Sequence, residues 1–203
     1  MFKEKLSPKD RIRLKLDPTK NVTPRAHSRP YDVPYNVREA MNNELSDAIE
    51  AGVLTPCSES SEWVHQMFLV PKPGRPEVRL VADFKRLNSA LQRPTYPVES
   101  NSQLLRHLRP SSRYFCTLDM TSGYHQIAVH EEDRHLLTVI STHGRFRYNS
   151  LSQGICSASD FFNFLSDGNI RWEACWRQLI KNMNMDNILM GAPTLAELES
   201  MIE

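Results

Sequence analysis

Apolar residues recur at every fourth position over residues 37–49, which is typical of an amphipathic helix with one buried face. Asn36 is suited to cap the start of this helix, and Gly52 follows its end. The pattern therefore predicts a first helix whose buried face is made by Val37, Met41, Leu45 and Ile49.

Two apolar runs follow, at residues 66–70 and 78–82, and both read as strands. Residues 71–76 between them are rich in proline and basic residues, which predicts a basic hairpin loop. Residues 114–119 predict a buried strand that ends in the carboxylate of Asp119. Two further hairpins are predicted, one around His143-Gly144 within residues 138–150 and one within residues 179–190, where a polar stretch interrupts an apolar run.

Three more helices complete the pattern. They are expected over residues 100–108, from about 157 to 176, and after Thr194, which forms a capping box with Glu197. Strands and helices interleave without a regular βαβ rhythm, so the predicted fold class is α+β with an antiparallel sheet and packed helices. Residues 1–35, rich in charge and proline, read as a basic extended arm.

Composition fits a globular protein. The chain has 203 residues, of which 40% are hydrophobic and 24% charged, and its formal net charge is +1. The sequence contains no apolar run long enough to cross a bilayer, and its first residues resemble no signal peptide, so we expect an intracellular protein without a membrane partner. The four cysteines form no C-x-x-C pair, which favours reduced thiols.

Charge is unevenly distributed along the chain. The first 30 residues carry nine basic and three acidic side chains, and a second basic run lies between residues 72 and 93. Local positive charge on a nearly neutral protein indicates contact with a polyanion at defined places. The alternative from charge alone is a solvated face or tail.

Three side chains are candidates for chemistry. Asp119 ends an apolar strand, Asp186 lies at the tip of an apolar hairpin, and Asn187 follows it. Charges at the ends of buried strands are costly unless they face a cleft or a cation, and carboxylates from two strands suit Mg²⁺. Such acids can hold the metal ions of a phosphoryl transfer. The alternative is a turn aspartate that bonds its own backbone.

An ordered series of short sequence words extends from about residue 11 to the end of the chain. Arranged in this order, the words resemble the reverse transcriptase domain of gypsy-like LTR retrotransposon polyproteins. They are Arg29–Tyr31, Gly52–Ser60, Phe68–Lys72, Arg79–Asn88, Thr117–Ile127, Leu151–Gly154 and Asn184–Leu189.

The resemblance implies a right-hand polymerase fold. Fingers would span residues 36–93 and 127–157, and a palm without a thumb would span 94–126 and 158–203. The implied activity is RNA-directed DNA polymerisation, a template-directed deoxynucleotidyl transfer with two Mg²⁺ ions or with Mn²⁺. The implied partners are an RNA or DNA template with its primer, deoxynucleoside triphosphates and other polyprotein domains, in a cytoplasmic particle or the nucleus.

The resemblance also implies a role for individual residues. Asp119, the Met120 carbonyl and Asp186 would bind metal, and Asn187 stands in the catalytic position next to Asp186. The residues implied to bind the nucleotide are Lys72 and Arg79 at the triphosphate, Tyr124 as the aromatic gate beneath the sugar, and Gln153 beside Gly154. Taken singly, Tyr124 could be a core residue, Arg79 a surface partner of Glu77 or Asp83, and Gln153-Gly154 a simple turn.

Two features depart from the family. The Y-x-D-D box reads Asn184-Met185-Asp186-Asn187, so an amide replaces the second carboxylate and one negative charge is lost beside the expected metal ions. The chain also ends before a thumb would begin, which predicts a polyprotein fragment or a decaying genomic copy. We therefore expect an impaired polymerase. The alternatives are a catalytically dead relic that at most binds nucleic acid, and a protein-interaction module.

Overall fold

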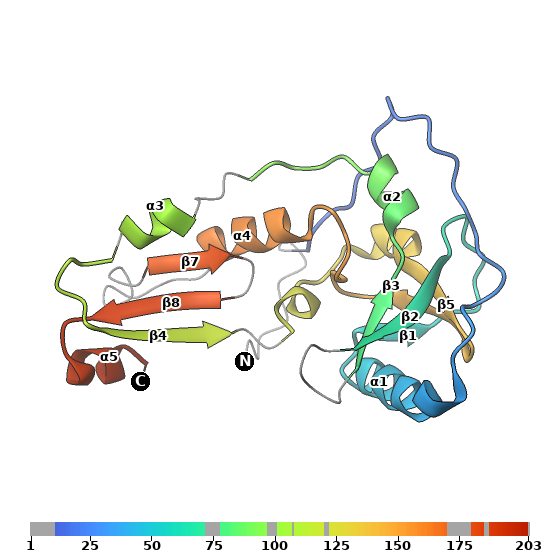
Figure 1. Ribbon diagram of the computed structural model, residues 1–203. Coiled ribbons are helices and arrows are strands. Elements are labelled where there is room, and N and C mark those ends of the chain that lie inside the picture. The colour runs from blue at the N-terminus through green and yellow to red at the C-terminus, as the bar shows by residue number, and fades with distance from the viewer. Residues whose placement is uncertain are drawn as a thin grey trace. The chain divides into compact units, whose positions relative to one another are not determined.

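A computed structural model covers residues 1–203 (Figure 1). It describes residues 11–71, 78–96, 101–106, 108–119, 122–169, 180–184 and 187–202. The chain divides into two compact units, which we describe separately. Unit 1 comprises residues Met1–Arg93 and Tyr124–Ala158, and unit 2 comprises Pro94–Gly123 and Ser159–Glu203.

Unit 1 is built on a five-stranded sheet. Its strands in spatial order are β1 (Leu54–Pro56), β6 (Gly144–Tyr148), β5 (Thr138–Ser141), β2 (His65–Pro71) and β3 (Val78–Ala82). Neighbouring strands are antiparallel except for β2 and β5, which run parallel. The predicted pair of strands at 66–70 and 78–82 is confirmed, as is the hairpin around His143-Gly144.

Helix α1 (Arg38–Glu50) packs against β1 and β3 and buries Met41 and Leu45, as the apolar periodicity predicts, whereas Val37 and Ile49, also predicted for the buried face, are only partly buried. The prediction that Asn36 caps this helix is wrong. Residues Tyr35–Val37 form a 3₁₀ turn, η2, in which the Val37 amide already donates to Pro34. The helix therefore begins after Val37, and no side chain caps it.

The remaining elements of unit 1 are short. They are helix α2 (Lys85–Ala90) and the 3₁₀ segments η3 (Gly123–Gln126) and η4 (Glu131–Leu137). The described part of the basic segment, residues 11–34, contains no helix or longer strand; isolated bridges join Ile12 to Val129, Leu16 to Leu91 and Ala26 to Val64.

Unit 2 contains a three-stranded antiparallel sheet in the order β4 (Tyr114–Asp119), β8 (Asn187–Ala192) and β7 (Ile180–Asn184) (Figure 1). Helix α3 (Asn101–Arg106) lies against β7, and helix α5 (Leu195–Ile202) lies against β4 and β8. Helix α4 covers Ala158–Asn169; the rest of the helix predicted to reach residue 176 lies outside the described residues.

A small apolar cluster lies between the sheet and α5. Met190 and Ala192 of β8 and Leu198 of α5 are buried, and Cys116 and Leu118 of β4 pack against them. The predicted capping of α5 is confirmed, because the Thr194 hydroxyl oxygen accepts a hydrogen bond from the Glu197 amide at 3.2 Å.

The prediction that residues 114–119 form a buried strand is wrong as to burial. Tyr114 and Phe115 are 44% and 55% exposed. Strand β4 lies at the edge of its sheet, and alternate residues of a strand point to opposite faces, so Phe115 points away from the face on which Cys116 and Leu118 pack against the cluster with α5. Tyr114 shares the face of Cys116 but is the first residue of the strand.

The secondary structure confirms the α+β fold class. In the described part of the chain, no helix is long and apolar enough to span a membrane. The described cysteines, Cys57, Cys116 and Cys156, are free thiols.

Candidate functional site

The candidate metal site lies where β4 ends and β8 begins. The backbone register of these antiparallel strands pairs Asp119 directly with Asn187. Such partners have Cα atoms roughly 4.5–5.5 Å apart. Asp186 is the residue immediately before β8; Asp186 and Met120 both lie outside the described residues. The sheet therefore places two of the predicted positions, Asp119 and Asn187, directly opposite each other, although they are 68 residues apart in sequence.

The donors expected at this site are the carboxylates of Asp119 and Asp186, the Asn187 amide oxygen and the Met120 carbonyl. All are hard oxygen ligands of the kind that Mg²⁺ and Mn²⁺ prefer, so the donor set fits a divalent cation. Within the described residues, no group of three histidine, cysteine or acidic side chains could hold a metal ion. The sharing of one metal by Asp119 and Asp186 stays a prediction.

The described residues predicted to bind the nucleotide lie in unit 1. Arg79 is an exposed residue of β3, opposite Val70 of β2. Burial lowers the pKa of the His125 imidazole, and the positive charge of Arg79 lowers it further. Tyr124 precedes His125 in η3 and is half-buried. Lys72 lies outside the described residues.

An aromatic contact connects this region to the segment that carries Gln153. The His125 and Tyr148 rings lie with their centroids 6.3 Å apart. Tyr148 is buried, which raises the pKa of its phenol to about 12, and the nearby Ser152 hydroxyl opposes part of this rise. The Ser152 hydroxyl donates to the Gln153 carbonyl at 3.2 Å. The ring contact between His125 and Tyr148 thus links the neighbourhood of Tyr124 with that of Gln153.

Gly154 completes the turn after Gln153 with a φ of +94°, a conformation that side-chain-bearing residues rarely adopt. The Asn88 side chain holds this turn from α2. Its amide nitrogen donates to the Gly154 carbonyl at 2.7 Å, and its amide oxygen accepts from the Cys156 amide at 2.9 Å.

Three supporting residues, Asn88, His125 and Tyr148, were not predicted as functional. Asn88 and His125 stand inside sequence words that carry the family resemblance, and this position was the available signal. For Tyr148, an aromatic residue three positions before Leu151, the sequence offers no comparable signal.

The alternative that Arg79 pairs with Asp83 is not what the structure shows. The Asp83 carboxylate accepts from the Lys85 amide at 3.1 Å, and among the described residues Arg79 makes no ion pair. Glu77, the other suggested partner, lies outside the described residues.

Two basic residues of the amino-terminal segment are already neutralised within unit 1. Arg11 pairs with Glu131 at 2.7 Å, and Arg13 binds the buried carboxylate of Asp133 through two nitrogens, at 2.7 and 3.1 Å. These two arginines are therefore not free cations for a polyanion, contrary to what the charge pattern suggests.

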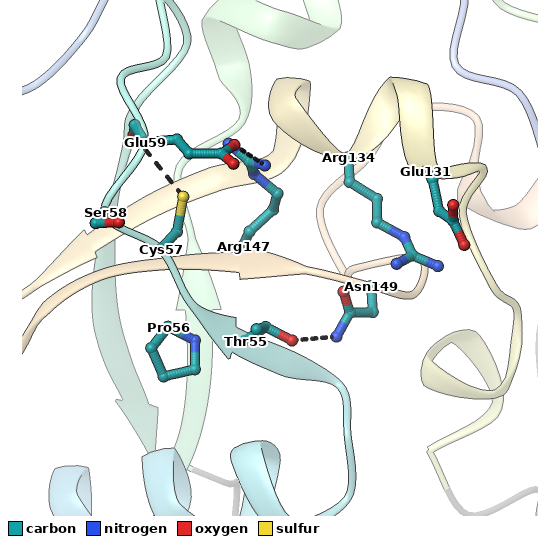
Figure 2. A pocket seen from close by; sticks show the side chains of 9 residues that line it. All are labelled: Thr55, Pro56, Cys57, Ser58, Glu59, Glu131, Arg134, Arg147 and Asn149. Atoms are coloured by element: carbon teal, nitrogen blue, oxygen red, sulfur yellow. Dashed lines mark hydrogen bonds and ion pairs between the residues drawn. The ribbon is translucent and has the colours of Figure 1, made fainter.

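A cavity of about 340 Å³ lies elsewhere in unit 1, and none of the predicted site residues lines it (Figure 2). Its polar side chains largely satisfy one another. Asn149 donates to the Thr55 hydroxyl at 2.6 Å and to the Gly52 carbonyl at 3.0 Å, and Arg147 pairs with Glu59 at 2.9 Å.

The chain resembles known proteins in sequence and in fold. Residues 70–203 match the family described as "Reverse transcriptase (RNA-dependent DNA polymerase)". The Pol polyprotein of the transposon opus from Drosophila melanogaster is 30% identical over 149 residues, which are 71% of this chain and 15% of that protein. The Pol polyprotein of the transposon gypsy, from the same organism, is 32% identical over 71% of this chain and 14% of its own length. The transposon Tf2-3 polyprotein of Schizosaccharomyces pombe is 32% identical over 83% of this chain and 12% of its own length.

The chain thus spans about a seventh of the length of these curated relatives. Solved structures agree on the fold. A foamy virus protease–reverse transcriptase in complex with double-stranded DNA matches with a TM-score of 0.73 at 18% identity, over 91% of this chain and 31% of that chain. The same kind of protein in complex with an RNA/DNA hybrid matches with a TM-score of 0.71 at 18% identity, over 91% of this chain and 24% of that chain. The α+β architecture is therefore that of polymerase fingers and palm, and the chain belongs to the reverse transcriptase (RNA-dependent DNA polymerase) family, as a domain of the LTR-retrotransposon kind.

Proposed function

We propose that the chain is the nucleotidyl-transfer domain of an RNA-directed DNA polymerase, with unit 1 as fingers and unit 2 as palm. The observation that supports this most directly is the register of β4 and β8, which pairs Asp119 with Asn187 next to Asp186. A polymerase of this family needs oxygen ligands from two neighbouring strands at one place, and this pairing supplies the required backbone positions.

Asp119, Asp186 and the Met120 carbonyl would hold two Mg²⁺ ions, or Mn²⁺ in their place. Bound there, the ions would supply Lewis-acid stabilisation of the charge that develops at the transferred phosphorus. The carboxylates would fix the position of the ions, and hydrogen-bonding residues of unit 1 would fix the nucleotide.

In unit 1, Lys72 and Arg79 would bind the triphosphate, because fixed cations offset phosphate charge. Tyr124 would lie beneath the sugar, where a flat ring can exclude a 2′-hydroxyl. Gln153, held at the Gly154 turn, would contact the nucleotide and the template. The ring contact between His125 and Tyr148, the hydrogen bond from Ser152 to Gln153 and the effect of the Arg79 charge on His125 support a common site for these residues.

Partners follow from the same proposal. They would be a primer on an RNA or DNA template, deoxynucleoside triphosphates and further domains of the polyprotein. The retrotransposon relationship suggests a cytoplasmic particle or the nucleus as the place of action.

We further propose that Asn187 impairs this site. An asparagine keeps an oxygen ligand but lacks the negative charge that would offset two divalent cations and a triphosphate. A tenfold rate loss corresponds to only about 1.4 kcal/mol of transition-state stabilisation, so losing one carboxylate can cost orders of magnitude. The same observation favours a second candidate function, a catalytically dead domain that binds nucleic acid without extending a primer.

The test compares primer extension by the parent chain with that by Asn187→Asp. Both are assayed alone and with the downstream segment of a gypsy-type polyprotein fused after Glu203, on an RNA template with Mg²⁺. We expect Asn187→Asp to extend primers at least about tenfold faster, because it restores an anionic ligand. Asp119→Asn in the repaired protein should abolish the gain.

Asn184→Asp is the matched control, because Asn184 pairs with Asn187 across the same hairpin and the substitution adds the same charge one strand away. An equal gain from Asn184→Asp would show a general charge effect rather than a repaired ligand. Equal extension by the parent and Asn187→Asp would refute the impairment. Failure of Asn187→Asp to extend primers, even when fused, would favour the dead domain.

A further inference from the structure

The turn at Gln153-Gly154 is held by side chains that come from two other parts of unit 1. Asn88, in α2, spans the turn with both ends of its side-chain amide: it donates to the Gly154 carbonyl at 2.7 Å and accepts from the Cys156 amide at 2.9 Å. A side chain that satisfies a donor and an acceptor of the same backbone segment fixes both its position and its direction.

Asn88 is itself fixed. Its backbone amide donates to the Phe84 carbonyl at 2.8 Å, and Phe84 is almost completely buried. A Cβ placed on Gly154 would contact Phe84 at 3.8 Å and the Ala82 carbonyl at 3.6 Å, so the turn lies directly against this part of the core. The turn therefore cannot shift away from α2 without breaking these contacts.

The other side of the turn is held by the Ser152 hydroxyl, which donates to the Gln153 carbonyl at 3.2 Å. The same hydroxyl lies beside the buried Tyr148 phenol, whose pKa it lowers against the opposing effect of burial. Ser152 thus links the backbone of Gln153 to Tyr148.

Tyr148 connects Ser152 to the rest of the proposed nucleotide site. Its ring is buried between Phe84, with centroids 6.2 Å apart, and His125, with centroids 6.3 Å apart. His125 follows Tyr124 in the chain and lies within the electrostatic influence of Arg79. A displacement of Tyr148 would therefore disturb both the Gln153 turn and the η3 segment.

We propose that Asn88, Tyr148 and Ser152 are positioning residues that hold the Gln153-Gly154 turn in the geometry needed to bind the incoming nucleotide. This inference rests on the proposed function, because it takes Gln153 as a nucleotide contact. The three residues touch no substrate; they act through the backbone of the turn.

Asn88→Ala tests the inference in the full 203-residue chain. Two titrations are compared: a deoxynucleoside triphosphate with Mg²⁺, followed by NMR, and a labelled primer–template duplex, followed by fluorescence anisotropy. We expect the nucleotide dissociation constant to rise by about tenfold or more, because two backbone groups of the turn lose their partner, and duplex affinity to change by no more than about twofold.

Asn149→Ala is the matched control. This asparagine also makes two side-chain hydrogen bonds in unit 1, to the Gly52 carbonyl and the Thr55 hydroxyl, but it lies at the cavity of Figure 2 rather than at the turn. Its removal should leave nucleotide affinity unchanged. An equal loss of nucleotide affinity in Asn149→Ala would reduce the role of Asn88 to general stability and overturn the inference.

Ser152→Ala provides a second, milder test, which decides the matter should Asn88→Ala fail to fold. It removes the hydroxyl that donates to the Gln153 carbonyl, so nucleotide binding should weaken by about threefold, whereas Tyr148→Phe, which keeps the buried ring, should have a smaller effect. Unchanged nucleotide affinity in Ser152→Ala would overturn the inference.

Failure of the inference and failure of the proposed function give different results. A parent chain that binds the nucleotide, together with an Asn88→Ala variant that binds it equally well, overturns the inference alone. A parent chain that binds no nucleotide with Mg²⁺ overturns the proposed function and the inference with it.

Discussion

The two units differ in how completely they enclose their side chains. Unit 1 buries large residues along its sheet and helices, including Phe84, Leu87, Leu137 and Tyr148, each no more than 2% exposed. In unit 2 the described buried cluster is small. Among the described residues, six large apolar side chains of this smaller unit are exposed, Leu105, Tyr114, Phe115, Phe164, Leu195 and Ile202, against four in unit 1, Leu16, Tyr31, Tyr35 and Val70.

This contrast bears on function. In unit 1 the Gln153-Gly154 turn lies against the buried Phe84 and is held by Asn88, so its geometry is fixed by the core, whereas Arg79 is exposed. In unit 2 the candidate metal positions are defined by strand register between β4 and β8, and one face of that sheet leaves Phe115 exposed. We infer that unit 1 is the more stable of the two, and each prediction below tests or refines that difference.

The largest effect is expected from Phe84→Ala in unit 1. The side chain is 1% exposed and contacts His65 and Tyr148, so its loss should destabilise the protein by about 3–5 kcal/mol. Leu198→Ala, in the small cluster of unit 2, should cost about 2 kcal/mol, the lower end for a buried leucine. Urea denaturation combined with hydrogen exchange measures both and assigns each loss to its unit.

Leu105→Ala is the control for this pair. Leu105 is 54% exposed, so its truncation should change stability by no more than about 0.5 kcal/mol. A Leu198→Ala loss as large as that of Phe84→Ala would contradict the difference between the units.

Two glycines should show different kinds of constraint. Gly154→Ala in unit 1 should cost about 1–3 kcal/mol because of the backbone, whose φ of +94° disfavours any side chain, although space for a Cβ exists. Gly191→Ala in unit 2 should cost about 1–3 kcal/mol because of crowding, since the new Cβ would lie 2.8 Å from Leu108 and 3.2 Å from Phe115.

Rescue distinguishes the two causes. Leu108→Ala should recover part of the loss in Gly191→Ala, measured as a favourable coupling energy in a double-mutant cycle of thermal unfolding. Gly154→Ala should not be rescued when its neighbour Phe84 is trimmed to leucine, because that strain lies in the backbone. Rescue at Gly154, or its absence at Gly191, would reverse the assignment.

Acid should weaken unit 1 selectively. Burial lowers the pKa of His65 and of His125 below the ordinary value of 6.5, with the Arg79 charge as a second cause at His125. The unfolded chain then binds protons at a pH where the folded protein does not, so stability is fully present above pH 6.5 and is lost as the pH falls below it. The urea midpoint of unit 1 should therefore be lower at about pH 5.5 than at about pH 7.5.

His125→Gln should reduce this pH dependence, whereas His143→Gln, at an exposed position, should leave it unchanged. The one histidine of unit 2, His107, lies outside the described residues, and the buried histidines with a lowered pKa belong to unit 1, so acid should change hydrogen exchange mainly in unit 1. Equal acid sensitivity in both units would contradict this assignment.

Local features of the fold could be predicted from the sequence. Apolar runs gave β2 and β3, and the Thr194–Glu197 spacing gave the start of α5, because strand pairing across a short loop and helix capping depend on nearby residues. The parallel pairing of β2 with β5 could not be predicted, since about 70 residues separate the two strands. Helix α2, six residues long, is too short for a periodic signal.

At the candidate site, too, local sequence signals were predictable and long-range contacts were not. Family words identified Arg79, Tyr124 and Gln153, but the contacts that connect them depend on tertiary packing. The Asn88 contact to Gly154 spans 66 residues, and the Arg13 contact to Asp133 spans 120. The charge pattern alone predicts that Arg13 is a free cation, because only the structure reveals its buried acidic partner, Asp133.

The smallest effect is expected from exposed ion pairs of unit 1, such as Arg11–Glu131 and Arg147–Glu59. Glu131→Gln removes the partner of Arg11, and Glu59→Gln removes that of Arg147; both carboxylates are largely exposed, so each change should lower stability only slightly. Raising salt to about 0.5 M should erase even this cost, because salt screens surface charges. Thermal unfolding of parent and variants at low and high salt measures the difference. A larger or salt-independent loss in Glu131→Gln would mean that the Arg11 contact holds the amino-terminal segment against η4 by more than surface electrostatics, and that unit 1 depends on this segment for its stability.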